Sequence, residues 1–293
     1  MKFTITHKTS YSYGEGVSLC QNLLRLHPRD HVWQKCVRHE LAITPNPSSQ
    51  SSHVDFFGNH VTWISLDEHH SEFNICATSE VHVETRPEID VATSMPWERV
   101  RDLLGASPEP THIEARQYVF DSPHVMTAGD LADYALVSFT PGRPLLEAAQ
   151  DLTERIHREF KFLPGSTDLG TTPMEVLRMR RGVCQDFAHL QLGCLRSIGL
   201  PARYVSGYLV TRPPPGQPRL VGADVSHAWV SVFEPAFGWV DFDPTNGVRP
   251  SDHHITIAWA RDYNEISPVR GITVGGASHQ LGVAVDVAPM DEV

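Results

Sequence analysis

Three residues in the second half of the chain have the types that catalysis by a nucleophilic thiol requires. They are Cys184, His227 and Asp243, in that order along the sequence. A thiol that attacks a carbonyl carbon needs a base to accept its proton, and the base needs a group that fixes its orientation. A cysteine, a histidine and a carboxylate can fill these roles if the fold brings them together, so the elements that carry them come next.

Cys184 lies at the expected start of a helix. From residue 183 to residue 198 apolar side chains recur with helical spacing, Gly182 comes just before them, and Gly199 and Pro201 follow. The first turn of a helix has unpaired N–H groups and the positive end of the helix dipole, and both favour a thiolate. Cys184 is therefore a candidate nucleophile, with an ordinary buried cysteine as the alternative.

His227 and Asp243 are expected on two neighbouring strands. Residues 226–233 and 238–242 have strand-like patterns and are joined by a short turn, so they predict a hairpin. Asp243 then falls opposite the start of the histidine strand, to within about two residues of register. Asp241 shares the face of Asp243 and is the alternative for the orienting role.

The composition limits the class of protein. A chain of 293 residues with 41% hydrophobic residues can form one large domain or two ordinary ones with a sizeable core. The net charge of -11 argues against a nucleic-acid partner. We find neither a membrane-spanning run nor the apolar centre of a signal peptide, and we expect a cytoplasmic protein without a membrane partner. The oligomeric state is left open.

Cysteines and histidines were considered as metal ligands. The five cysteines include no CxxC pair, which argues against a disulfide framework and a thiolate zinc site. The pairs His69-His70 and His253-His254 have no carboxylate at ligand spacing, and adjacent residues of a strand point to opposite faces. We interpret both pairs as surface histidines and expect neither a metal nor a cofactor.

The rest of the chain falls into segments with different patterns of residue types. Residues 1 to about 85 alternate polar and apolar residues between turns, which predicts an antiparallel β-sandwich. Residues 86–143 contain short helical pieces interrupted by prolines, and residues 145–160 form an amphipathic helix. Residues 212–218 are expected to be an exposed loop because they contain four prolines. Alternating residues from Ile255 onward predict late strands that return to a sheet.

Four separate blocks resemble the bacterial transglutaminase-like proteins, whose core is similar to papain-like cysteine enzymes. The blocks are Gly182-Val183-Cys184-Gln185-Asp186-Phe187-Ala188-His189, Gly199-Leu200-Pro201-Ala202-Arg203-Tyr204-Val205-Ser206-Gly207-Tyr208, His227-Ala228-Trp229 and Asp243-Pro244-Thr245-Asn246. Residues 261–271 resemble the extension that these proteins carry after the core. The resemblance covers nearly the whole chain.

The resemblance implies an α+β fold in four parts. An N-terminal antiparallel β-sandwich domain would occupy residues 1–90, and a connector packed on the domains would occupy residues 91–143. A papain-like, transglutaminase-like catalytic core would follow at 144–248, with a C-terminal β extension at 249–293.

The resemblance also implies the roles of the three site residues. Cys184 would be the nucleophile, His227 the base and Asp243 its orienter, and the Asp-Pro-Thr-Asn block favours Asp243 over Asp241. The implied reaction is acyl transfer at an amide bond of a peptide or protein through a thioester on Cys184. We expect a hydrolytic peptidase or amidase. The alternatives are an amine-accepting transglutaminase and a non-catalytic binding or assembly protein.

The residues around the site have expectations of their own. Asp186 and His189 do not share the helix face of Cys184, so we expect them to bond to backbone or to line the rim. The other four cysteines are expected to be buried. Arginines are expected on the rim of the cleft, where they would disfavour a cationic lysine as the acyl acceptor: Arg178, Arg180, Arg181 and Arg212.

We predict that Cys184 is the most reactive thiol of the chain, because a helix N-terminus and a nearby histidine both lower a thiol pKa. Iodoacetamide labelling followed site by site by mass spectrometry near neutral pH should modify Cys184 first. Equal or faster labelling of Cys20 or Cys194 would contradict the assignment of Cys184 as the nucleophile.

Overall fold

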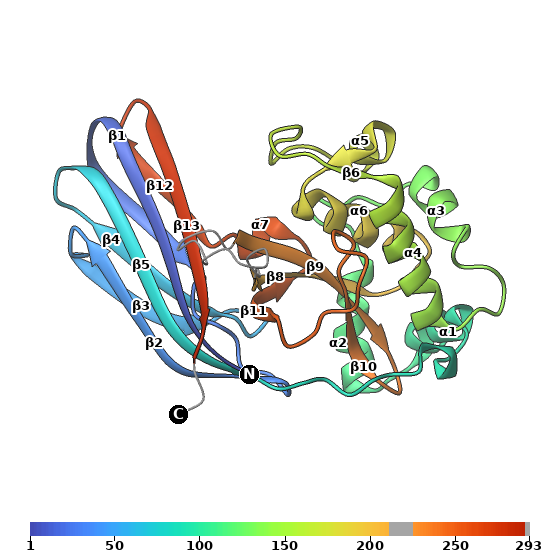
Figure 1. The fold of residues 1–293 in the computed structure, drawn as a ribbon. Coiled ribbons are helices and arrows are strands. Elements are labelled where there is room, and N and C mark those ends of the chain that lie inside the picture. Colours follow the sequence, from blue (N-terminus) through green and yellow to red (C-terminus); the bar gives the residue numbers. More distant parts are fainter. Residues whose placement is uncertain (211–224, 291–293) are drawn as a thin grey trace, which may run out of the picture.

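The computed structural model describes residues 1–210 and 225–290 and confirms the expected α+β class. An antiparallel sheet lies on one side of the molecule, and a helical part with a second sheet lies on the other (Figure 1). The predicted loop at residues 212–218 lies outside the described residues. None of the helices in the described ranges combines the length and the hydrophobicity that a membrane crossing requires.

The first sheet is organised around one long strand, β1 (Lys2–Leu24). The first half of β1 pairs with β5 and β13, and its second half pairs with β4 and β12. Because both halves share β1, the expected sandwich takes the form of one curled sheet with a hydrophobic core of its own. The other strands of this sheet are β2 (Gln34–Thr44), β3 (Ser49–Val54), β4 (His60–Leu66), β5 (His70–Val83), β12 (Val269–Gly275) and β13 (His279–Pro289).

Alternation along β1 and β13 attaches this sheet to the rest of the molecule. Phe3 and Ile5 of β1 are buried, as are Val285 and Val287 of β13. All four belong to the same hydrophobic core as the helical part of the molecule. Residues two apart on a strand share a face, so one face of the N-terminal sheet is packed directly against the second half of the protein.

Short helices follow the first sheet. Their bounds are η1 (Val91–Thr93), α1 (Trp97–Ala106), α2 (Pro110–Arg116), η2 (Gln117–Val119) and α3 (Gly129–Leu136). Prolines lie where these helices begin: Pro96 precedes α1, and Pro110 is the first residue of α2, a position that needs no backbone N–H. Trp97, Val100 and Leu104 of α1 are buried, so the proline-rich segment is ordered and packed.

The helix that begins with Cys184, α6 (Cys184–Ser197), lies in the centre of the helical part. Every residue from Asp186 to Arg196 is buried, in agreement with its apolar circumference. Around it lie α4 (Leu145–Glu159), α5 (Pro173–Met179) and the two-residue strands β6 (Lys161–Phe162) and β7 (Arg181–Gly182). The second sheet packs against α6 in the order β10-β9-β8-β11. Its strands are β8 (Ala202–Leu209), β9 (Val225–Glu234), β10 (Gly238–Phe242) and β11 (His254–Ala260).

Two side-chain amides of the first sheet's half of the molecule close the free edge of β11. Gln34 donates from Nε2 to the Thr256 carbonyl at 2.7 Å and accepts the Thr256 N–H at 2.8 Å. Asn59 does the same with Trp259, at 2.9 Å and 3.0 Å. Each amide thus imitates a neighbouring strand, which satisfies backbone groups that an edge strand leaves unpaired.

The last part of the chain is divided between the two sheets. β11 pairs with β8 in the second sheet, whereas β12 and β13 pair with β1 in the first. The short helix α7 (Tyr263–Ile266) lies between them. The chain therefore passes from the first sheet through the helical part and back, and the returning strands bring C-terminal residues close to Cys184.

Candidate active site

The start of α6 is fixed by a carboxylate of its own first turn. Asp186 accepts the Val183 N–H at 2.7 Å and the Thr167 hydroxyl at 2.7 Å. A Cβ at Gly182 would lie 2.7 Å from the Asp186 carboxylate, so only glycine fits this close approach. The prediction that Asp186 bonds to nearby backbone is confirmed. Its effect is to hold the chain just before Cys184, whose side chain is half-buried at the first helical position.

His227 and Asp243 lie in hydrogen-bond contact at the start of β9 and just after β10. His227 donates from Nε2 to Asp243 Oδ2 at 2.7 Å, and both side chains are buried. In the hairpin Asp241 pairs with Ser231, so Asp243 comes level with Trp229 and reaches His227 within the expected two residues of register. Cys184 lines the same cleft as His227 and lies close enough to raise the pKa of the histidine. The structure therefore brings together the three residues that the sequence singled out.

Asp243 is held by a dense set of donors. Besides His227, its Oδ2 accepts from Asn246 Nδ2 at 2.7 Å and from His254 Nε2 at 3.0 Å. Its Oδ1 accepts the backbone N–H groups of Thr245 and Asn246 at 2.9 Å and 3.2 Å. The Asp-Pro-Thr-Asn block is thus a turn whose first carboxylate bonds to the backbone of the same turn, which fixes the carboxylate where the histidine meets it.

The second histidine on this carboxylate, His254, overturns one interpretation. The pair His253-His254 was interpreted as surface histidines, but His254 is only 5% exposed. The same interpretation is wrong for His70, which is 6% exposed and bonds through Nδ1 to the Glu68 carbonyl. In both pairs one residue faces inward, as the alternation of a strand requires. Because His254 donates from Nε2, its enclosed Nδ1 is an acceptor, and it has no partner among the described residues.

The same side chains form a possible metal-ligand set. Ligand atoms of His227, Asp243 and His254 lie within 4.8 Å of one another. Both histidine Nε2 atoms already donate hydrogen bonds to Asp243, and a metal ion bound there would have to replace both bonds and their protons. The arrangement thus has a complete explanation in hydrogen bonding alone.

Asp241, the alternative to Asp243 for orienting His227, has other partners. It accepts the Trp229 indole N–H at 3.1 Å and forms a salt bridge with Arg86 at 2.7 Å. Trp229 is fully buried, and a Cβ at Gly207 would lie 2.5 Å from its ring, so Gly207 makes room for the indole. The indole of Trp229 is thus part of the interior, where it meets the His254 ring in an edge-on arrangement.

The electrostatics of the site favour an ion pair. Burial raises the pKa of the Asp243 carboxyl, but hydrogen bonds from His227 and His254 lower it well below its ordinary value. Burial lowers the pKa of His227, but its hydrogen bonds with Asp243 and Cys184 and their charges raise it to about 10. His254 remains neutral because burial lowers its pKa. An imidazolium at His227 therefore lies between a carboxylate and the thiol.

Both halves of the molecule line the cleft at Cys184. This cleft, about 340 Å³ in volume, has Cys184, Gln185, Tyr204 and His227 on one side. Strands of the first sheet form the opposite wall with His7, Thr9, Tyr11, Leu281 and Val283. A hydrogen bond of 2.7 Å between His7 and the Tyr208 hydroxyl links the two walls. The periodicity of the sequence does not predict this wall, because the wall forms only when β1 pairs with β13.

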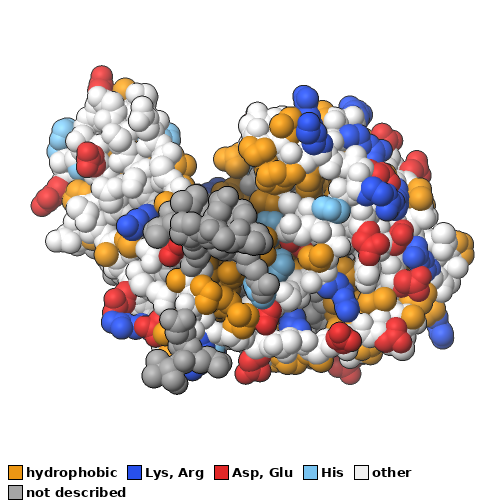
Figure 2. All heavy atoms as spheres, viewed as in Figure 1, with side chains coloured by type: hydrophobic (Ala, Val, Ile, Leu, Met, Phe, Trp, Pro, Cys, Tyr) orange, Lys and Arg blue, Asp and Glu red, His pale blue; other side chains and the backbone are white. Residues whose placement is uncertain are grey.

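The arginines expected on the rim do not line this cleft. Arg180 turns away to form a salt bridge of 3.0 Å with Glu159, and neither Arg178 nor Arg181 contributes to the lining. Arg212 lies outside the described residues. Among the described lining residues there is no lysine, arginine, aspartate or glutamate. Figure 2 shows a deep indentation between the two halves, with hydrophobic side chains gathered on its helical wall. Exposed hydrophobic residues on β6 and around α5 are Phe162, Leu163, Leu169 and Met179.

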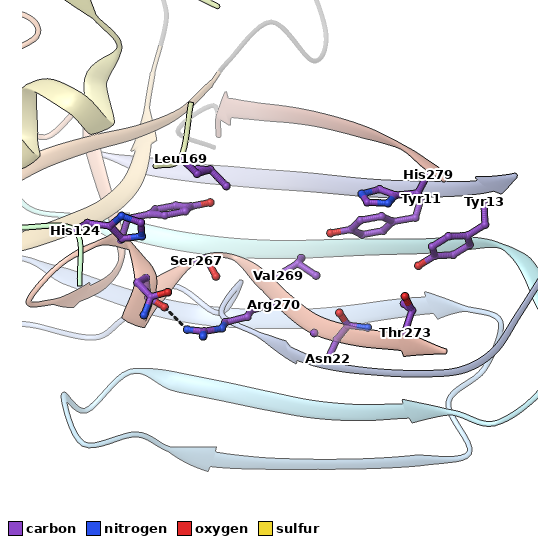
Figure 3. Close-up of a pocket in the computed structure, with 13 residues that line it drawn as sticks. Tyr11, Tyr13, Asn22, His124, Leu169, Ser267, Val269, Arg270, Thr273 and His279 are labelled. Carbon is purple, nitrogen blue, oxygen red and sulfur yellow. Dashed lines mark hydrogen bonds between the residues drawn. The ribbon is translucent and has the colours of Figure 1, made fainter. Parts of the chain in front are cut away.

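A second hollow continues the cleft over the first sheet (Figure 3). Its volume is about 390 Å³, and it shares Tyr11, Tyr263 and Val269 with the cleft at Cys184. Tyr11, Tyr13 and His279 lie side by side along it, and the two tyrosine rings are stacked. Arg270, which lies across from them, bonds to the Asn264 carbonyl at 2.7 Å. Together the two hollows form a groove that extends from the thiol across the first sheet.

The remaining predictions have mixed outcomes. His189 is buried and accepts the Tyr263 N–H at 3.2 Å, which confirms that it bonds to backbone. Cys20 and Cys194 are buried as expected, but Cys36 and Cys76 are half-buried. Burial raises the pKa of the Cys194 thiol to about 12 and that of Cys36 to about 11. Partial exposure therefore does not make Cys36 a good nucleophile at neutral pH.

We predict that Asp243→Asn lowers the pKa of His227. The carboxylate raises that pKa in the wild-type protein, so without it only Cys184 opposes the effect of burial, and the ring loses its proton at a lower pH. NMR titration of the His227 ring measures the shift. Asp241→Asn is the matched control and should change the His227 pKa far less. Equal shifts in the two variants would show that the Asp243 hydrogen bond does not control the histidine.

Comparison with known proteins was made for the sequence and for the fold. Residues 3–82 match the bacterial transglutaminase-like N-terminal region, and residues 136–244 match the transglutaminase-like superfamily core. An uncharacterized protein of Mycobacterium tuberculosis is 38% identical over 99% of this chain and 93% of its own length. One of Mycobacterium leprae is 29% identical over 98% of both chains.

Two further matches carry functional names. A protein-glutamine gamma-glutamyltransferase of Pseudomonas aeruginosa is 40% identical over 34% of this chain but only 15% of its own length. A crystal structure from Cytophaga hutchinsonii, provisionally named a cysteine protease, covers 100% of this chain and 92% of its own with a TM-score of 0.77. At 19% identity that likeness concerns the fold alone. Sequence and fold together show that the chain belongs to the bacterial transglutaminase-like family.

Proposed function

We propose that the protein is a cysteine enzyme that transfers the acyl group of an amide bond through a thioester on Cys184. The observation that carries the proposal is the hydrogen bond of 2.7 Å between His227 and Asp243, formed beside a cysteine at a helix N-terminus. The hydrogen bond and the charge of Asp243 help to hold His227 as an imidazolium, which places a proton donor beside the leaving group of an amide bound at Cys184. Water is the proposed default acceptor.

The chemistry follows from these positions. The Cys184 thiolate attacks the amide carbon, and the oxyanion forms near the Cys184 N–H at the start of α6. His227 donates its proton to the leaving amine as the C–N bond breaks, which leaves a thioester. His227 then accepts a proton from water as that water attacks the thioester; the C–S bond breaks, the carboxylic acid leaves, and the thiolate and the imidazolium are restored. Asp243 keeps its charge and holds the ring throughout.

Two side chains of the cleft are candidates for the second oxyanion donor. The Tyr204 hydroxyl is close enough to Cys184 for a thiolate to raise its pKa, after the larger effect of burial. The Gln185 amide also lines the cleft. Neither belongs to the three residues that the sequence singled out, although both stand in the quoted sequence blocks. We favour Tyr204 because burial holds its ring in place between His189 and Tyr263.

The groove supports a peptide substrate. Its two hollows of about 340 Å³ and 390 Å³ can take several residues of an extended chain, and their walls are hydrophobic and aromatic with hydroxyl groups between. The described lining at Cys184 has no carboxylate that would attract a cationic lysine and no arginine that would repel one. A lysine amine is almost wholly protonated near neutral pH, so without such an acid water remains the favoured acceptor.

A cytoplasmic location and a peptide or protein substrate remain part of this proposal. All five cysteines are free, which suits a compartment that keeps thiols reduced. The competing proposal, a binding or assembly protein on this fold, would need no histidine–carboxylate pair beside a cysteine. We therefore rank it below the enzyme, and an amine-accepting transglutaminase stands between them.

We predict that Asp243→Asn keeps the fold but lowers the turnover of a cleaved peptide amide roughly ten- to ten-thousand-fold. Asp241→Asn should lower turnover less and act mainly on stability, because it weakens the partner of the half-buried Arg86 guanidinium. Circular dichroism and single-turnover rates on the same samples separate the two effects. The reverse ranking of turnover would move the orienting role to Asp241.

The acceptor is tested by competition. The wild-type chain is given an accepted peptide acyl donor and a labelled primary amine at millimolar concentration, and both products are followed by mass spectrometry. We expect mainly the hydrolysed acid, and no product of either kind with Cys184→Ala. Dominant amine incorporation would overturn the hydrolytic assignment while leaving the thioester proposal intact.

A further inference from the structure

A buried arginine lies on the face of the second sheet that points away from α6. Arg203 of β8 stands between Ala202 and Tyr204, which belong to the core shared with α6, so its side chain leaves the opposite face. It is 7% exposed. Its guanidinium carbon lies 3.7 Å from the ring centre of Trp259 and 4.2 Å from that of Trp239. The candidate active site makes no use of this side chain.

Arg203 has no anionic partner within the described residues. Its Nε is enclosed without a hydrogen-bond acceptor, and no salt bridge reaches its guanidinium. The nearest buried carboxylate, Asp241, is already paired with Arg86 at 2.7 Å. Attraction to two indole faces is small beside the cost of removing a guanidinium from water. The positive charge of Arg203 therefore has no carboxylate to balance it among the described residues.

The guanidinium borders a cavity of about 500 Å³. Aromatic residues dominate its walls, and the tryptophans among them are Trp33, Trp239 and Trp259. Arg86 and His31 also line the cavity, and Arg86 Nε and His31 Nε2 are enclosed without partners. Because His31 Nδ1 accepts the Trp33 N–H at 3.2 Å, a neutral His31 carries its proton on Nε2 and is a donor.

The enclosed charges that line the cavity are two guanidinium groups and one carboxylate. Arg29 lies over the Trp259 ring at 3.6 Å, so this indole contacts two guanidinium groups. Arg86, the second guanidinium of the lining, is paired with that carboxylate, Asp241. Burial lowers the pKa of Arg203 to about 10, which still leaves it charged at neutral pH. Glu114, the other acid of the lining, is exposed.

We propose that this cavity is a binding site for a small organic carboxylate with a flat apolar body. The carboxylate meets the fork of Arg203, which presents parallel N–H groups, and the body lies among the tryptophan rings. The site lies apart from the groove at Cys184, with which it shares no lining residue. The proposal therefore stands whether or not the thioester mechanism is correct.

Benzoate is a suitable probe, with benzamide as its uncharged match and inorganic phosphate as an anion without an apolar body. Binding to the full chain is measured by calorimetry and by the fluorescence of the tryptophans that line the cavity. We expect saturable benzoate binding, and binding of benzamide and phosphate about tenfold weaker or more. No saturable binding of benzoate, or equal binding of benzamide, would overturn the proposal. Phosphate binding as tight as benzoate would overturn the assigned ligand class.

Variants locate the site. Arg203→Met should weaken benzoate binding about tenfold or more, whereas Arg249→Met, which lines a neighbouring cavity and not this one, should leave it unchanged. If Arg203→Met does not fold, Arg203→Lys retains the charge without the planar fork and should also weaken binding. Unchanged binding in the folded Arg203 variant would place the carboxylate elsewhere and contradict the inference.

Discussion

A buried carboxylate persists in its charged form only when donors surround it, and the fold around Asp243 supplies five hydrogen bonds from four residues: His227, Thr245, Asn246 and His254. These donors come from three places: the first strand of the hairpin, β9, the turn that contains Asp243, and the edge strand β11. Loss of one partner of a buried charge typically costs about 3–5 kcal/mol, so these segments cannot shift independently of one another. The position of His227 relative to Cys184 follows from this constraint, because the ring is held from the side that faces away from the thiol.

The edge strand β11 extends that constraint to the first sheet. His254 begins β11, and the amides of Gln34 and Asn59 complete its outer edge. Within the first sheet, β13 carries Leu281 and Val283 to the cleft and packs Val285 and Val287 into the shared core. The N-terminal sheet is therefore a wall of the groove as well as a neighbouring domain. His7, Thr9 and Tyr11 of this wall are separated from Cys184 by more than half of the sequence.

Local patterns predicted the parts of the site that depend on local structure. The helix start at Cys184 and the hairpin that brings Asp243 to His227 follow from periodicity, turn residues and register. The burial of His254 could not be predicted, because two adjacent histidines do not indicate which one faces inward until the position of the strand in its sheet is known. The wall formed by β1 and β13 was not visible for a similar reason: such pairing joins residues at opposite ends of the chain. Arg180 was placed on the rim by its proximity in sequence, but a left-handed backbone at that residue turns it toward Glu159.

Asp243 and Arg203 are both buried, but only the charge of Asp243 has hydrogen-bond partners among the described residues. Asp243 has a donor for each of its oxygens, so its burial is explained by the protein itself. Arg203 is as enclosed as many core residues, yet its described surroundings offer aromatic faces and other cations. Asp241 on the same face as Arg203 already accepts from Trp229 and Arg86 through its Oδ2. Pairing of Asp241 with Arg203 instead would take the carboxylate away from Arg86. The imbalance of one charge remains under either pairing, and this is the reason to look for the missing anion outside the chain.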